Sequence, residues 1–153
     1  MPDWLEIVAR LFAAALIGGG IGINRHLHHK AIGLRTLSLV CSGAAGLVLA
    51  SLHSAGTTLH FDAMSRVIQG IMTGVGFLGA GVIIRSQVDD KVHGLTTAAV
   101  VWITAAIGAL CGMGEWKILI VLSAIVAVVL LIGGPVERWC DTARQGKSKD
   151  PRA

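Results

Sequence analysis

The stretch GIMTGVGFLGAGVIIR, from Gly70 to Arg85, has glycine at positions 70, 74, 76, 79 and 81 and a charge only at its end. Such a high frequency of glycine indicates either a loop that closes on a ligand or a helix that packs closely against its neighbours. The positions 74, 76 and 79 match G-x-G-x-x-G, which binds a dinucleotide only after a strand and with an acidic residue about 20 positions further on. Here the glycines lie inside an apolar run, and residues 100–108 are uncharged. The stretch therefore favours a packed membrane helix over a nucleotide loop.

The composition points to lipid as the solvent. Apolar residues make up 54% of the chain and charged residues 14%, the mean hydropathy is +0.72 and there are 20 glycines. Soluble domains are nearer about 45–50% apolar and about 25% charged. The net charge of +4 resides in short connectors and not on a basic face, so we expect no nucleic-acid partner.

Five windows are long and apolar enough to cross a membrane when Gly, Ser and Thr are counted as packing residues. They cover residues 5–23, 36–52, 67–84, 95–113 and 116–134. The sequence thus predicts an all-α fold, a polytopic membrane helix bundle over residues 1–134 with the glycine-rich helix at its centre. Residues 135–153 are expected to form a short, partly disordered cytoplasmic tail.

The basic residues predict the orientation. With the first residue outside, one side of the membrane holds ten of them: Arg25, Lys30, Arg35, Arg85, Lys91, Arg138, Arg144, Lys147, Lys149 and Arg152. The other side holds Arg10, Arg66 and Lys117. Because Lys and Arg accumulate on the cytoplasmic side, we expect a periplasmic N-terminus and a cytoplasmic C-terminus.

Small residues four apart indicate where helices could approach each other closely. The predicted packing set is Gly70, Gly74, Gly76, Gly79, Gly81, Trp102, Gly108 and Gly112, with Gly18 and Gly22 at the same spacing in the first span. Such faces serve either plain helix packing or a lined pathway. The packing interpretation predicts that leucine at position 76 or 79 would hold two helices apart.

The nine acidic residues all lie in connectors, tails or span ends, so no buried carboxylate marks a cation site or proton relay. Carbonyls at a glycine break, or a ring of several copies, could still supply oxygen ligands. No Ser, His and acidic set falls on one side, and tyrosine is absent. We therefore predict no enzyme activity, no catalytic residue, no bound metal and no cofactor.

Polar residues gather at the span ends predicted to be cytoplasmic. They are Asn24, Arg25, Arg35, Thr36, Arg85, Thr96 and Thr97. These arginines and hydroxyls either snorkel and cap helices or recognise an anionic lipid head group or a partner's acidic surface. The histidines at 26, 28 and 29 could titrate near neutral pH or hold a metal.

Three motifs carry a resemblance to a known family. They are Gly-Leu-Arg-Thr at 33–36, Gly-Val-Gly-Phe-Leu-Gly-Ala-Gly-Val-Ile at 74–83, and Gly-Leu-Thr-Thr-Ala-Ala at 94–99 followed by Trp102. Their order and spacing resemble the MgtC/SapB family of bacterial inner-membrane proteins. The family's first turn usually reads Gly-Leu-Glu-Arg-Glu, whereas this chain has Asn24 and His26 around Arg25. The tail is too short for the soluble C-terminal domain of some members.

The resemblance implies a multi-span protein of the bacterial inner membrane, linked to growth in low magnesium and, in some pathogens, to survival in host cells. It favours a non-enzymatic regulator or adaptor that contacts membrane lipid and another membrane protein, or associates with itself. The alternative is a transporter or channel for Mg2+ or another small solute.

Overall fold

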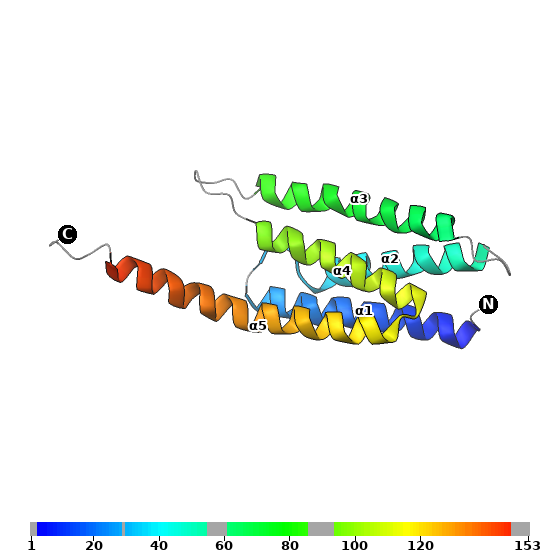
Figure 1. Cartoon of the computed structure of the whole chain (residues 1–153), viewed down its shortest axis with the longest axis horizontal. Coiled ribbons are helices and arrows are strands. Elements are labelled where there is room, and N and C mark those ends of the chain that lie inside the picture. Colours follow the sequence, from blue (N-terminus) through cyan, green and yellow to red (C-terminus); the bar gives the residue numbers. More distant parts are fainter. Residues whose placement is uncertain (1–2, 29, 55–60, 86–93, 148–153) are drawn as a thin grey trace.

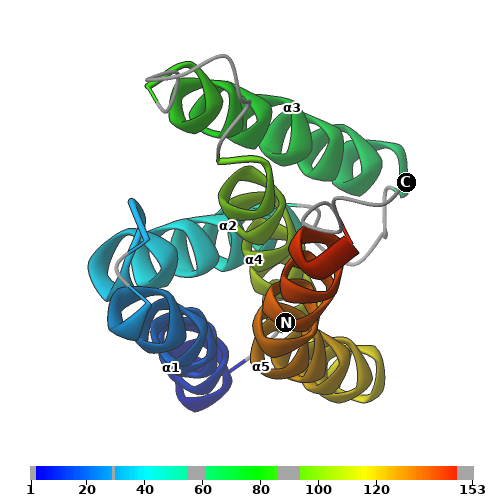
Figure 2. The same ribbon diagram turned by 90° about the vertical axis from the view of Figure 1, so that its left-hand side faces the viewer.

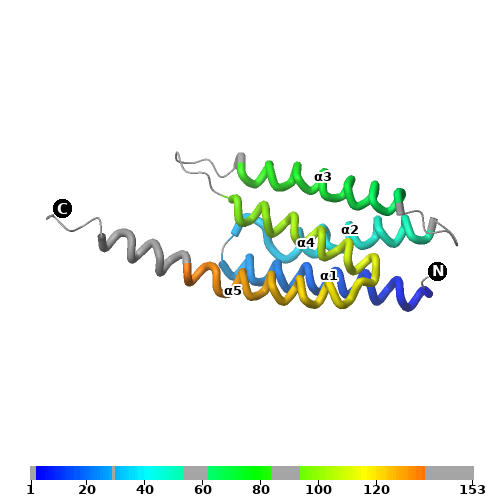
Figure 3. The backbone as a smooth tube through the Cα atoms, viewed as in Figure 1, coloured from blue at the N-terminus to red at the C-terminus, as the bar shows by residue number. Residues whose placement is uncertain are grey.

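The computed structural model describes residues 3–28, 30–54, 61–85 and 94–147. These residues form five helices. They are α1 (Trp4–Leu27), α2 (Leu34–Ser54), α3 (Phe61–Arg85), α4 (Leu95–Met113) and α5 (Trp116–Lys147). Each contains a stretch long and apolar enough to cross a membrane. The predicted all-α polytopic bundle is confirmed. Successive helices alternate in direction, so α1 begins and α5 ends at opposite ends of the bundle (Figures 1 and 3).

The helices form three layers, with α3 on one side, α2 and α4 in the middle, and α1 and α5 on the other side (Figure 1). Viewed end-on, α4 lies between α3 and the pair formed by α1 and α5 (Figure 2). In α4, 56% of the apolar membrane-spanning window is buried inside the bundle. In α3, the corresponding share is only 6%. The core of the bundle is therefore built around α4.

The central position predicted for the glycine-rich helix is wrong, because that helix, α3, is peripheral. Gly70, Gly74, Gly76 and Gly81 have no described atom within 4 Å of the place where a Cβ would lie. Only Gly79 approaches a neighbour, with Ala98 Cβ at 3.4 Å from that place. α3 instead packs through its larger side chains, among them Val67, Ile71 and Val75, so its glycines are left on the faces between them.

Two other glycine pairs make the close contacts. Cβ atoms built at Gly18 and Gly22 of α1 would lie 2.6 Å from Leu37 O and 2.5 Å from Leu34 Cα in α2. Cβ atoms at Gly108 and Gly112 of α4 would lie 2.2 Å from Cys41 O and 2.6 Å from Ala45 O, also in α2. All four neighbours are backbone atoms, so α1 and α4 both touch the main chain of α2.

One further expectation needs correction. Trp102, predicted to be a packing residue, is 47% exposed. The last helix also extends beyond the predicted span end at residue 134, since α5 continues through Pro135 as far as Lys147. Proline inside a helix removes one backbone hydrogen bond and crowds the carbonyl four residues earlier, and membrane helices tolerate this where neighbouring groups compensate. Residues 148–153 lie outside the described part of the chain.

The contact at Gly108 predicts a large effect of a small change. We expect Gly108→Ala to lower the free energy of unfolding by about 1–3 kcal/mol or more, because the new methyl group must displace the Cys41 carbonyl. Unfolding in mixed detergent micelles, followed by tryptophan fluorescence, measures the change. Gly76→Ala is the matched control, since it adds the same methyl group in open space. Equal loss of stability in both variants would contradict the close contact between α4 and α2.

Candidate functional site

A buried arginine links the end of α1 to the beginning of α4. Arg25 lies in the last turn of α1 and is only 6% exposed. Its Nη2 donates a hydrogen bond of 2.6 Å to Oγ1 of Thr97, which lies in the first turn of α4 and is also 6% exposed. The two residues are 72 positions apart in the sequence. This bond fixes the polar ends of two antiparallel helices against each other.

Within the described part of the chain, the charge of Arg25 is poorly compensated. Its Nε is buried and has no hydrogen-bond partner, and a neutral hydroxyl is the acceptor for its Nη2. The only ion pair among the described residues is formed elsewhere, between Arg10 and Glu6. The carbonyl end of α1 offsets part of the cost, by about 0.3–2 kcal/mol for a cation in the last turn. An unpaired buried cation remains unfavourable, so this end of the bundle should attract anions.

The other predicted residues are not part of this hydrogen bond. Arg35 and Thr36 are exposed in the first turn of α2, and Thr96 is exposed beside the buried Thr97. Arg85 ends α3, and its side chain lies outside the described part of the structure. The backbone carbonyl of Asn24 accepts a 2.7 Å hydrogen bond from Nδ1 of His28.

The histidines do not assemble a metal site in the part of the chain that is described. His26 and His28 are exposed at the end of α1, and His29 lies outside the described residues. No group of three His, Cys, Asp or Glu side chains comes together within residues 3–28, 30–53, 62–83 and 94–136, whose side chains the structure describes. Cys41 and Cys111 are buried, free thiols in the helix core, as expected for small packing residues.

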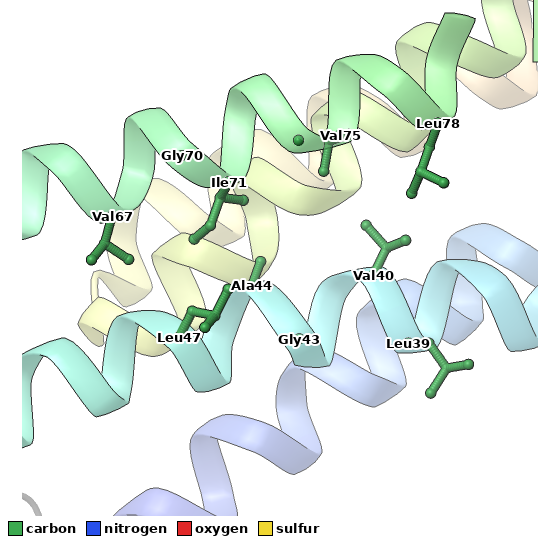
Figure 4. Close-up of a pocket in the computed structure, with 11 residues that line it drawn as sticks. Leu39, Val40, Gly43, Ala44, Leu47, Val67, Gly70, Ile71, Val75 and Leu78 are labelled. Atoms are coloured by element: carbon green, nitrogen blue, oxygen red, sulfur yellow. The ribbon is translucent and has the colours of Figure 1, made fainter. Parts of the chain in front are cut away.

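Two hollows lie between α2 and α3. The larger, of about 480 Å³, is lined by apolar residues from both helices, including Gly43, Gly70 and Gly74 (Figure 4). The second, of about 430 Å³, lies at the Thr36 end of α2, and its other lining residues include Gly81 and Val101. Val101 is one helical turn beyond Thr97 on α4, so this hollow is next to the Arg25–Thr97 bond.

Comparison with known proteins identifies the family. Residues 11–139 match the MgtC family model. The chain belongs to the MgtC family. It is 43% identical to protein SrpB of Synechococcus elongatus, over 76% of this chain and 68% of SrpB. It is 41% identical to protein MgtC of Salmonella typhimurium, over 82% of this chain and 49% of that protein.

A third relative in the MgtC family is named putative magnesium transporter YhiD, from Escherichia coli, and is 38% identical over 82% of this chain and 59% of YhiD. The chain thus spans about half of the length of the Salmonella protein and somewhat more of the others. The comparison with solved structures gives no significant match.

The sequence around Arg25 differs from the pattern that the MgtC family leads us to expect. The family resemblance leads us to expect glutamates on both sides of this arginine, whereas this chain has Asn24 and His26. Neither neighbour can supply a carboxylate.

A second arginine contact, at the opposite end of α1, was missed by sequence reasoning. Arg10 forms an ion pair with Glu6, and its Nη1 also donates a 2.7 Å hydrogen bond to the carbonyl of Gly112. α4 is capped by Gly114, whose φ of 78° is in the left-handed region, and a Cβ there would meet Arg10 at 2.6 Å. The glycine after the fourth span was the available signal for a helix end, where the last carbonyls have no partner within the helix.

The Arg25–Thr97 bond predicts an asymmetric effect of mutation. We expect Thr97→Val to lower the free energy of unfolding by about 1.5–3 kcal/mol, because it removes the acceptor of a charged donor and leaves that charge buried. Adding Arg25→Met should recover most of the loss, because it replaces the cation with an apolar side chain of similar length.

Unfolding in mixed micelles measures these variants, and the exposed neighbour provides the control as Thr96→Val. A double variant less stable than Thr97→Val alone would show that Arg25 stabilises the bundle by other contacts.

Proposed function

We propose that this MgtC-family protein is a non-enzymatic regulator or adaptor of the bacterial inner membrane that acts by contact with another membrane protein. The observation that carries the proposal is the open outer face of α3. Gly76 has no described atom within 4 Å of a built Cβ, and the neighbouring Phe77 is 81% exposed. A small residue beside a large exposed one suits close packing against a partner helix in lipid.

The charges of the bundle favour a regulator over a cation transporter. Among the described residues, the acidic side chains whose exposure is known, Asp3, Glu6, Asp62 and Glu115, are exposed and lie at helix ends. The buried charged residue is Arg25, whose positive charge repels Mg2+. A dehydrated divalent cation needs a path lined by oxygen ligands and negative charge. The exposed acidic side chains and the buried arginine do not provide such a path.

The physiological setting proposed is adaptation to low magnesium, which rests on the names of the relatives MgtC and putative magnesium transporter YhiD. We further propose that the polar end of the bundle is cytoplasmic and contributes to recognition. Its residues are Asn24, Arg25, Arg35, Thr36, Arg85, Thr96 and Thr97.

Crosslinking tests the partner face. A photo-crosslinking amino acid at position 77 should give a discrete adduct with one membrane protein in native membranes, and Gly76→Leu should abolish it. Position 16 is the control crosslinker site, because Leu16 is 62% exposed on α1, away from α3. Gly20→Leu is the control variant, since Gly20 also has open space around a built Cβ. The same adducts from positions 77 and 16 would contradict a specific α3 interface.

Transport of Mg2+ is the second candidate function, because the E. coli relative is named a putative magnesium transporter. An assay with purified protein in vesicles that contain a Mg2+-sensitive dye distinguishes a transporter from a regulator. A regulator gives no protein-dependent entry of Mg2+ under an inward gradient. Protein-dependent entry that saturates with Mg2+ would replace the regulator proposal with the transporter.

The orientation makes a separate prediction. A reporter enzyme that is active only in the cytoplasm should be active when fused after Arg152, because ten of the thirteen basic residues fall on that side. A reporter active only in the periplasm provides the complementary measurement at the same junction. Activity of the periplasmic reporter there would reverse the proposed topology.

A further inference from the structure

A continuous apolar groove runs between α2 and α3 and faces outward from the bundle. The hollow of about 480 Å³ between these helices and the hollow of about 430 Å³ at the Thr36 end share Leu78 as a lining residue. Every side chain that lines the two hollows is apolar except that of Thr36. The groove is therefore apolar along its length and polar at one end.

The groove exists because α2 and α3 diverge and because glycine leaves the gap unfilled. At the end where residues 55–60 connect the helices, Leu52 of α2 and Met64 of α3 pack on one shared core cluster. The helices separate toward Leu39 and Leu78 (Figure 4). Cβ atoms at Gly43, Gly70 and Gly74, which line the gap, would meet no described atom within 4 Å.

The groove is shorter than a bilayer is thick. Its lining on α3 runs from Val67 to Val82, which is about 22 Å at about 1.5 Å per residue. The hydrocarbon core of a bilayer is about 30 Å thick. A partner helix that crosses the membrane would therefore extend beyond the groove, whereas a lipid acyl chain need not.

Positive charge lies at the polar end of the groove. Thr36 presents a hydroxyl there, and the exposed Arg35 precedes it in the first turn of α2. Val101 lines the same end and lies one turn from Thr97, the hydrogen-bond partner of the buried Arg25. Among the described residues, the Nε of Arg25 has no hydrogen-bond partner, and its Nη2 contacts only the neutral hydroxyl of Thr97. The chemistry that complements this end is a phosphate.

We propose that the groove between α2 and α3 binds one anionic phospholipid. The acyl chain lies along Gly43, Gly70 and Gly74. It makes dispersion contacts with the groove lining, which would have no such contacts if the groove were empty. The phosphate lies at Thr36 and Arg35. The site is separate from the outer face of α3 proposed for a partner, because Gly76 and Phe77 do not line either hollow.

Photolabelling in vesicles tests the proposal. The full chain is reconstituted with phosphatidylglycerol carrying a diazirine in its acyl chain, and the adducts are mapped by digestion and mass spectrometry. Adducts should concentrate on α2 and α3 at the groove. Phosphatidylcholine with the same labelled chain should label these segments about fivefold less, the effect expected of one basic residue near an anionic group. Arg35→Gln with Thr36→Val should remove that difference.

Two matched glycine variants distinguish lipid binding in the groove from lipid contact elsewhere on the surface. Gly74→Leu fills the groove and should reduce the adducts there, whereas Gly76→Leu adds the same side chain outside the groove and should leave them unchanged. Size-exclusion chromatography in detergent checks that both variants fold. If Gly74→Leu does not fold, the proposal is tested by comparing how strongly phosphatidylglycerol and phosphatidylcholine label the groove of the unaltered chain.

Four outcomes would overturn the proposal. Adducts spread evenly over all exposed helices, or equal effects of the two leucine variants, would mean contact with bulk lipid only. Equal labelling by the two lipids would remove the anion site at Thr36. A crosslink between two copies of the chain that replaces the lipid adduct and is lost in Gly74→Leu would assign the groove to a second copy.

Discussion

The close approach of α1 and α4 to the backbone of α2 is the constraint on which the rest of the bundle depends. Lipid tails are as apolar as leucine, so helices in a membrane gain little from hiding apolar side chains. They associate through dispersion, which falls off steeply with distance. Gly108 of α4 and Gly18 of α1 bring main chains into contact with α2 and so make this the tightest part of the structure. α3 and α5, whose spans are only 6% and 11% buried, attach to this three-helix core.

Polar contacts then fix the register of the core at both ends. At one end Arg10 donates to the carbonyl of Gly112 at the end of α4, and at the other Arg25 donates to the hydroxyl of Thr97 at its start. Both arginines come from α1, which runs antiparallel to α4. Sliding α1 along α4 by one turn would break both bonds, and Arg10 would then keep only its ion pair with Glu6 within α1. Glycine contacts therefore set how close the helices lie, while the arginines set their alignment.

The sequence predicted the five membrane helices because hydropathy over about 20 residues is a strong local signal. It also placed Arg25 and Thr97 at the same end of the bundle. It could not assign the glycines, since a four-residue spacing says that a close contact is possible but not which helix supplies it. Gly108 and Gly112 make such contacts and Gly70 and Gly74 do not, although the two pairs have the same spacing. A segment alone can show where unpaired carbonyls lie, as Gly114 does at the end of α4, but it does not show which distant residue contacts them, as Arg10 does.

The division between a tight core and a loosely held α3 also bears on function. A helix with little buried surface can present its glycines to other molecules without disturbing the fold, and α3 has two such surfaces. Gly70 and Gly74 open onto the groove beside α2, while Gly76 and Phe77 face outward. A lipid in the groove would change how α3 sits against α2, and with it the face that we propose for a partner. Lipid binding and partner binding would then be coupled through one helix, and such coupling must be reciprocal.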